Sequence, residues 1–163
     1  MDVATADNDL FGSLMTSYLA QMESAMKISS IVSEHSSEEE LSADSVITGL
    51  VYRLMTPMKD EEMKDSFNEA KKILNISSSD EDLDEDLDEG NSINEFIDIK
   101  TTDFHDKVII NRNVKRNNCN CDICIQCRVC LTNYKNYEIH GDKLSQIFKD
   151  AIDNACSIHN ISI

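Results

Sequence analysis

Cysteine is concentrated in one short segment of this chain. Five of its six cysteines lie between residues 119 and 130, namely Cys119, Cys121, Cys124, Cys127 and Cys130. Thiolates are soft, anionic ligands, so cysteines at this density predict a bound zinc ion or an iron–sulfur cluster. Two Cys-x-x-Cys pairs are present, but only two residues separate them, which is closer than two pairs sharing one zinc usually lie. The run also fits an iron–sulfur loop, in which three ligands come from one turn.

Further ligands and other interpretations stay open on the sequence alone. His140 could complete a zinc site, and Cys156 could supply a remote thiolate. A flexible cysteine-rich loop without metal is the main alternative. A redox dithiol is less favoured, because no strand–helix pattern typical of thioredoxin surrounds either pair. The histidines, His35 among them, have no spacing that marks a nucleophile and its base, so we interpret them as surface residues and predict that the chain is not an enzyme.

Basic residues gather around the cysteines. Six of them lie between positions 107 and 135: Lys107, Arg112, Lys115, Arg116, Arg128 and Lys135. Asp122 is the one acidic residue in that range, and Tyr134 and Tyr137 lie nearby. Cations beside aromatic rings are typical of single-stranded RNA binding sites. The same cations could instead pair with the acidic residues between 80 and 89 of this chain.

Acidic residues dominate the chain as a whole. It carries 31 acidic against 15 basic residues, a net charge of −16, which favours basic partners over nucleic acid for most of the surface. The segment from Ser77 to Gly90 holds acidic residues without a cation, and we predict a disordered linker over residues 77–94. Ser77, Ser78 and Ser79 each precede an acidic residue by three positions, which indicates phosphorylation by an acidophilic Ser/Thr kinase.

Apolar residues at helical spacing flank this linker. They predict helices from Asn8 to Val32, from Leu41 to Leu54 and from Met63 to Leu74, and so a small bundle or hairpin over residues 1–76. Capping patterns place the second start at Ser36 and Ser37 and the third at Thr56-Pro57. Short alternating runs at Glu95–Ile99 and Lys107–Ile110 predict a β-hairpin within a basic, cysteine-rich segment, 95–140.

A last helix is predicted over residues 141–163. Its apolar face is the predicted oligomerisation surface and contains Leu144, Ile147, Phe148, Ala151, Ile152 and Ala155. The fold class is therefore mainly α. The N-terminus is acidic and lacks an apolar run, so we expect no secretory signal, no membrane association and a reducing compartment.

A serine-led acidic tract, basic residues near Cys-x-x-Cys and a C-terminal amphipathic helix resemble, over residues 77–158, the viroplasm phosphoprotein family of rotaviruses. The resemblance implies a phosphorylated scaffold that self-associates, with Ser77–Ser79 modified by a host kinase, a Cys-x-x-Cys pair binding metal and residues 144–155 driving assembly. It also implies binding to RNA, to a basic viral replication protein and to the viral polymerase, within inclusion bodies of the host cytoplasm. The alternative function is a zinc-binding viral transcription or host-interaction factor.

Overall fold

The computed structural model describes residues 3–79 and 111–163, and it confirms a mainly helical chain. The elements are α1 (Val3–His35), α2 (Ala43–Met55), α3 (Asp60–Ser79), β1 (Arg112–Asn113), α4 (Asp122–Asn133), the 3-10 helix η3 (Tyr134–Asn136), α5 (Lys143–Ile158) and β2 (Ile161–Ser162). The linker predicted from residue 77 begins later, because Ser77–Ser79 belong to the last turn of α3. The rest of that linker and the predicted hairpin lie outside the described residues.

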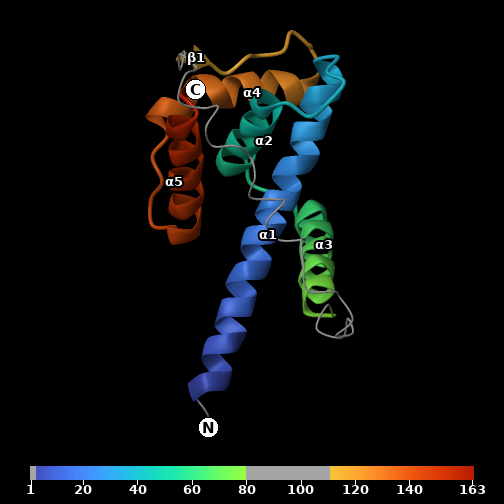
Figure 1. Cartoon of the computed structure of the whole chain (residues 1–163), viewed down its shortest axis with the longest axis vertical. Helices are drawn as coiled ribbons and strands as arrows, with labels where there is room; N and C mark the ends of the chain where they lie inside the picture. Colours follow the sequence, from blue (N-terminus) through green and yellow to red (C-terminus); the bar gives the residue numbers. More distant parts are fainter. Residues whose placement is uncertain (1–2, 80–110) are drawn as a thin grey trace, which may run out of the picture.

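The long helix α1 is the axis of the fold. Both α2 and α3 pack on it, and α3 and α5 lie on opposite sides of it (Figure 1). Small residues allow α2 to approach closely, since a Cβ on Gly49 would overlap Ser29 Oγ. Ser29, which interrupts the apolar stripe in the sequence, is buried and donates a hydrogen bond to the Ala25 carbonyl at 2.9 Å. Ser29 interrupts the apolar pattern because it lies at a close contact between α1 and α2.

Three predicted helix starts differ from the structure. Helix α1 begins at Val3 and not at Asn8, and the predicted starts of α2 and α3 are wrong by several residues. The N-cap of α2 is Ser42, whose hydroxyl accepts from Ser45 N at 3.1 Å, whereas Ser36 and Ser37 belong to the turn that ends α1. Thr56 is the C-cap of α2, with its N–H donating to Tyr52 O, and α3 begins only at Asp60. Serine and threonine occur both where one helix ends and where the next begins, so the capping pattern alone did not fix where α2 and α3 start.

Within the cysteine-rich segment, Cys124, Cys127 and Cys130 lie on a helix where the sequence predicted a ligand loop. Cys124, Cys127 and Cys130 recur every three residues and place their thiols on the buried side of α4, with Leu131. Of these residues, Cys127, Cys130 and Leu131 join a core that includes Val51, Tyr52 and Phe148. Cysteine behaves here as a small apolar residue.

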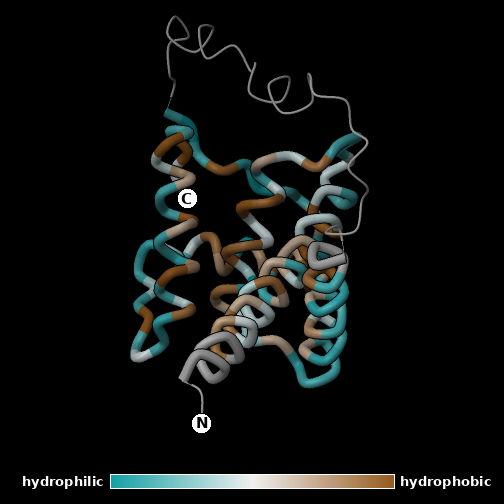
Figure 2. The backbone as a smooth tube through the Cα atoms, turned by 60° about the horizontal axis from the view of Figure 1, so that its bottom comes forward, coloured by the Kyte–Doolittle hydropathy of each residue, from teal (hydrophilic) through white to brown (hydrophobic). Residues whose placement is uncertain are grey.

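Helix α5 begins as predicted. Asp142 is its N-cap and accepts from the N–H groups of Leu144 and Ser145. Hydrophobic and hydrophilic residues alternate along α5, at the left of Figure 2. Its apolar face is partly used within the chain, because Phe148 and Ile152 are buried.

The remaining residues of the predicted oligomerisation surface differ in burial: Leu144 is half-buried, while Ile147, Ala151 and Ala155 are exposed.

A short parallel strand pair joins the end of the chain to the cysteine-rich segment. In this pair Arg112 lies opposite Ile161, and Val114 N donates to Ser162 O at 2.8 Å. The pair fixes the segment that leads into the first cysteines. Within the described ranges, no helix is long and apolar enough to span a membrane.

Candidate metal centre

Four side chains from two distant parts of the sequence meet at one end of α1. His35 is the last residue of α1, Cys119 and Cys121 lie in the loop before α4, and Cys124 lies in the first turn of α4. Their ligand atoms all lie within 4.8 Å of one another. The cluster could therefore hold a metal ion.

The distances within the cluster fit a tetrahedral ion. His35 Nδ1 lies 3.2 Å from Cys121 Sγ, 3.4 Å from Cys124 Sγ and 3.6 Å from Cys119 Sγ. In a tetrahedral zinc site the imidazole nitrogen and a thiolate sulfur are about 3.6 Å apart, as follows from the metal–ligand bond lengths. Three thiols and one imidazole form a Cys3His set, which is a common structural zinc site.

Hydrogen bonds hold the loop in this arrangement. Arg128 Nη1 donates to the carbonyl oxygens of Asn117 and Cys119, at 3.0 and 2.6 Å, and to the Asn117 side chain at 3.1 Å. Asn117 Nδ2 in turn donates to Cys124 Sγ at 3.0 Å. Partners beyond the ligands that orient them in this way are a usual part of metal sites.

Electrostatics differ between the ligand thiols. A hydrogen bond from the backbone N–H of Cys124, at the N-terminus of α4, lowers the pKa of Cys121 to about 7. Burial raises the pKa of Cys124 to about 11. Because a metal binds the thiolate, Cys121 is the thiol most readily prepared for an incoming cation, and the charge of that cation would have to ionise Cys124.

The structure thus brings together three of the five predicted cysteines and not the other two. Cys127 and Cys130 are buried in the core, where burial raises the pKa of Cys127 to about 12, and Cys156 is buried on α5. His140 is exposed, with Glu138 as its nearest charged partner at 3.9 Å.

The histidine of the cluster was missed. His35 follows the apolar stripe of α1 and lies 84 positions before Cys119, so no local spacing links the two. Only the folding of the chain shows that they meet.

The predicted RNA-binding residues are divided by the fold. Arg112 pairs with Asp44 at 2.6 Å, and Arg128 is occupied by the loop described above. Lys115, Arg116 and Lys135 are exposed, and Lys107 lies outside the described residues. Two of the five described cations are therefore engaged within the chain, and three are exposed.

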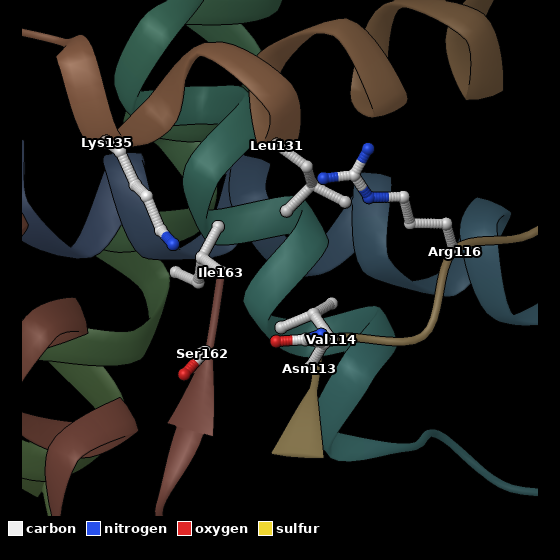
Figure 3. Close-up of a pocket in the computed structure, with 7 residues that line it drawn as sticks. All are labelled: Asn113, Val114, Arg116, Leu131, Lys135, Ser162 and Ile163. Atoms are coloured by element: carbon white, nitrogen blue, oxygen red, sulfur yellow. The ribbon is translucent and has the colours of Figure 1, made fainter. Parts of the chain in front are cut away.

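Two of the exposed cations border one pocket. Arg116 and Lys135 approach it from opposite sides (Figure 3), and its volume is about 280 Å³. Val114, Leu131 and Ile163 supply its apolar walls. None of the described residues that line it is acidic.

Comparisons with protein-family models, with curated proteins and with solved structures give no match to this chain. Arguments about its function therefore rest on its own residues.

Proposed function

We propose that this chain is a non-enzymatic binding protein whose C-terminal region is held to its helical bundle by a zinc ion. The observation that carries the proposal is the convergence of His35, Cys119, Cys121 and Cys124 within 4.8 Å. These four protein ligands would fill a tetrahedral coordination sphere. A filled sphere leaves no position for a substrate or an activated water, which is the character of a structural zinc site.

The ligand set favours zinc over an iron–sulfur cluster. Clusters of two or four irons are usually held by four thiolates that surround several metal atoms. Here one imidazole nitrogen lies at nearly equal distances from three sulfurs, which suits a single ion. Zinc also accepts nitrogen and sulfur ligands together without a redox requirement.

The proposed ion would act as a cross-link. It would join the end of α1 to the loop that precedes α4, across 84 positions of sequence. Because the ligands converge only in the folded chain, the binding free energy of the ion would stabilise that chain and hold the exposed residues around Lys115 and Arg116 in one arrangement. A zinc-dependent regulatory or interaction factor is the class of protein that this arrangement supports.

Metal analysis of purified protein tests the proposal. We expect one zinc per chain, and a cobalt-substituted form with the intense near-ultraviolet charge-transfer absorption of thiolate ligands. His35→Ala and Cys121→Ser should each reduce bound zinc strongly. Cys127→Ala is the matched control and should retain it, because Cys127 is buried in the core. Metal-free protein after preparation in zinc-replete medium, or equal zinc loss from the control, would reject the site.

A second candidate function is RNA binding by a self-associating scaffold, and the pocket between Arg116 and Lys135 favours it. Two cations at one concave site with no acidic lining residue among those described could bind a phosphate. Phosphorylation at Ser77–Ser79 and assembly in viral inclusion bodies belong to the same proposal.

Fluorescence anisotropy with a labelled single-stranded RNA tests this candidate. The variant Arg116→Ala/Lys135→Ala should bind more weakly and show a smaller salt dependence. A charge-matched control is Lys64→Ala/Lys71→Ala, which removes two exposed cations from α3. Equal effects of the two double variants would show that net charge alone, and not this pocket, controls binding.

A further inference from the structure

Two of the clustered cysteines occupy the first turn of α4. Cys121 is the N-cap of this helix, with an extended backbone (φ −71°, ψ 156°), and Cys124 is the third helical residue. The side chain of an N-cap residue lies over the first turn and reaches toward the third helical residue. The two sulfur atoms lie within 4.8 Å of one another. Cys121 and Cys124 are therefore neighbours along the helix axis.

This spacing suits a disulfide bond. Residues three positions apart on an α-helix have Cα atoms about 5 Å apart, as follows from the rise and radius of the helix. Disulfides join residues whose Cα atoms are about 4.4–6.8 Å apart. Rotation of the two side chains can therefore bring the sulfur atoms of Cys121 and Cys124 into bonding contact while α4 keeps its backbone.

The two thiols differ in access from solvent. Cys121 is partly exposed, whereas the exposed fraction of Cys124 is 0%. His35 and Cys119 line an open pocket of about 360 Å³, so small molecules can approach the cluster from that side. An accessible sulfur beside a buried one suits a two-step exchange, in which the first sulfur attacks an external disulfide and the second resolves the mixed disulfide.

We propose that Cys121 and Cys124 form a reversible disulfide by exchange with low-molecular-weight disulfides such as glutathione disulfide, and that this disulfide releases the bound metal. Cys121 is the attacking residue and Cys124 the resolving residue. The exchange depends only on the positions of the two cysteines. The release of metal rests on the zinc site proposed above.

The exchange proceeds in two steps. The Cys121 sulfur attacks one sulfur of glutathione disulfide, the external S–S bond breaks, and one glutathione leaves. The Cys124 sulfur then attacks the Cys121 sulfur of the mixed disulfide, and the second glutathione leaves. The two protein sulfurs are oxidised and the external disulfide is reduced to two thiols. The two departing glutathiones take up protons from the protein thiols, or from solvent where zinc already holds the sulfurs as thiolates.

Formation of this disulfide removes two of the four metal ligands. Zinc binds thiolates, and a disulfide sulfur carries no such charge. His35 and Cys119 alone would leave half of a tetrahedral sphere unfilled. The connection between α1 and the loop before α4 is then lost, and reduction of the disulfide restores it.

A second Cys-x-x-Cys pair on the same helix is an internal comparison. Cys127 and Cys130 have the same spacing, but their exposed fractions are 2% and 8%, and both lie in the core. Glutathione disulfide is too large to enter a packed core. Spacing alone would make the two pairs equally reactive, whereas the fold favours the pair at the start of α4.

Differential alkylation of the full chain tests the proposal. The purified protein, with its zinc content measured, is treated with glutathione disulfide, and free thiols are blocked before reduction and a second label. We expect Cys121 and Cys124 to be oxidised at least about tenfold faster than Cys127 and Cys130. Cleavage after Arg128 separates Cys127 from Cys130, so mass spectrometry distinguishes the two possible disulfides. A chromogenic chelator should detect one zinc released for each disulfide formed, and dithiothreitol should reverse both changes.

Variants separate the attacking residue from the resolving one. Cys119→Ser should still form the disulfide. Cys119→Ser/Cys124→Ser should instead keep one glutathione on Cys121, because no neighbouring thiol in the cluster is left to resolve it. Cys121→Ser should react at least about tenfold more slowly, since Cys124 is buried. Cys127→Ala is the matched control and should react like the wild type. Far-ultraviolet circular dichroism checks that all variants keep their helices.

Several results would overturn the proposal. These are a wild-type disulfide between Cys119 and Cys121, glutathione that stays on wild-type Cys121, oxidation of Cys127 and Cys130 at the same rate, or zinc that stays bound after the disulfide forms. A chain that carries no zinc but forms the Cys121–Cys124 disulfide would reject the zinc site and support the exchange. The two proposals therefore fail separately.

Discussion

At the scale of single residues, Gly49 controls how closely α2 approaches α1. A Cβ there would overlap Ser29 Oγ and the Ala25 carbonyl oxygen, and it would lie 2.8 Å from Ser29 N. Two of these neighbours are backbone atoms, which cannot rotate away. We expect Gly49→Ala to lower the free energy of unfolding by about 1–3 kcal/mol, the usual cost of overpacking, despite the better helix propensity of alanine. Urea denaturation measures this.

Gly12→Ala is the control for that substitution. A Cβ at Gly12 meets nothing within 4 Å in the single chain, so in dilute protein the same exchange should stabilise by up to about 1 kcal/mol. Equal and favourable effects at both glycines would mean that α1 and α2 are less closely packed than the structure shows.

Buried thiols make stability depend on alkaline pH. Burial raises the pKa of Cys127 to about 12, so this thiol stays neutral in the folded chain while it ionises in the unfolded chain near its ordinary pKa of about 8.5. Stability is fully present below that value and is lost as pH rises above it, by about 1.4 kcal/mol per pH unit for each such proton. Urea denaturation between pH 7 and pH 10.5 should show a shallower decline for Cys127→Ala than for the wild type. Parallel declines would contradict the assignment.

For the cysteines, the sequence predicted the kind of chemistry better than it predicted which of them lie together in the fold. It predicted thiol ligands for a metal, and three of the five cysteines converge with His35 in a cluster that could hold an ion. Cys127 and Cys130 could not be separated from Cys121 and Cys124, because a spacing of three suits both a ligand turn and the buried side of a helix. His35 could not be found at all, since its proximity depends on tertiary structure.

At the scale of elements, a buried arginine joins α2 to α3. Arg53 is buried and pairs with Glu62, which also accepts from Ser24 Oγ on α1 at 3.0 Å. Glu62→Ala would leave the cation without its partner, so we expect a loss of about 2–4 kcal/mol, somewhat less than for a fully buried pair because Glu62 is partly exposed. Thermal or urea unfolding measures the loss.

Glu61→Ala is the matched control for that variant. Glu61 is the exposed neighbour on α3, and its removal should change stability by less than about 0.5 kcal/mol. Similar effects of the two substitutions would show that charge on α3, and not the pair with Arg53, is responsible.

Helical periodicity predicted where four of the helices lie, but not where α1, α2 and α3 begin. The apolar stripes located α1, α2, α3 and α5, since burial of one face requires that spacing. The sequence did not predict helix α4, because its buried residues are mostly cysteines, which were interpreted as metal ligands. The helix boundaries around Ser36, Ser42 and Thr56 depend on which side-chain hydroxyl caps a free backbone N–H group. The sequence offers several serine and threonine hydroxyls there, so it did not fix the boundary.

At the scale of the whole molecule, the proposed zinc ion should stabilise the connection between two parts of the fold. Zinc that binds only the folded chain, at about 1,000 times its Kd, would stabilise that chain by roughly 4 kcal/mol, so a chelator should lower the unfolding temperature by about 10 °C. Most helical circular dichroism should remain, because α1, α2 and α3 pack together without the cysteine-rich segment. Differential scanning calorimetry with and without chelator gives both values.

His35→Ala provides the control for chelation, since its unfolding temperature should not respond to the chelator. An unchanged temperature for the wild type would remove the structural role of the ion. Loss of all helical signal would instead mean that the bundle cannot form without it.

The parallel pairing of β1 with β2 has a consequence for the order in which the chain folds during synthesis. Translation completes α1, α2 and α3 long before the ribosome reaches Ile161 and Ser162, and segments made early generally fold first. The strand that leads to Cys119 cannot pair until Ile161 and Ser162 emerge. Nascent chains should therefore contain the packed helices α1, α2 and α3, with His35 at the end of α1, before β1 and β2 pair.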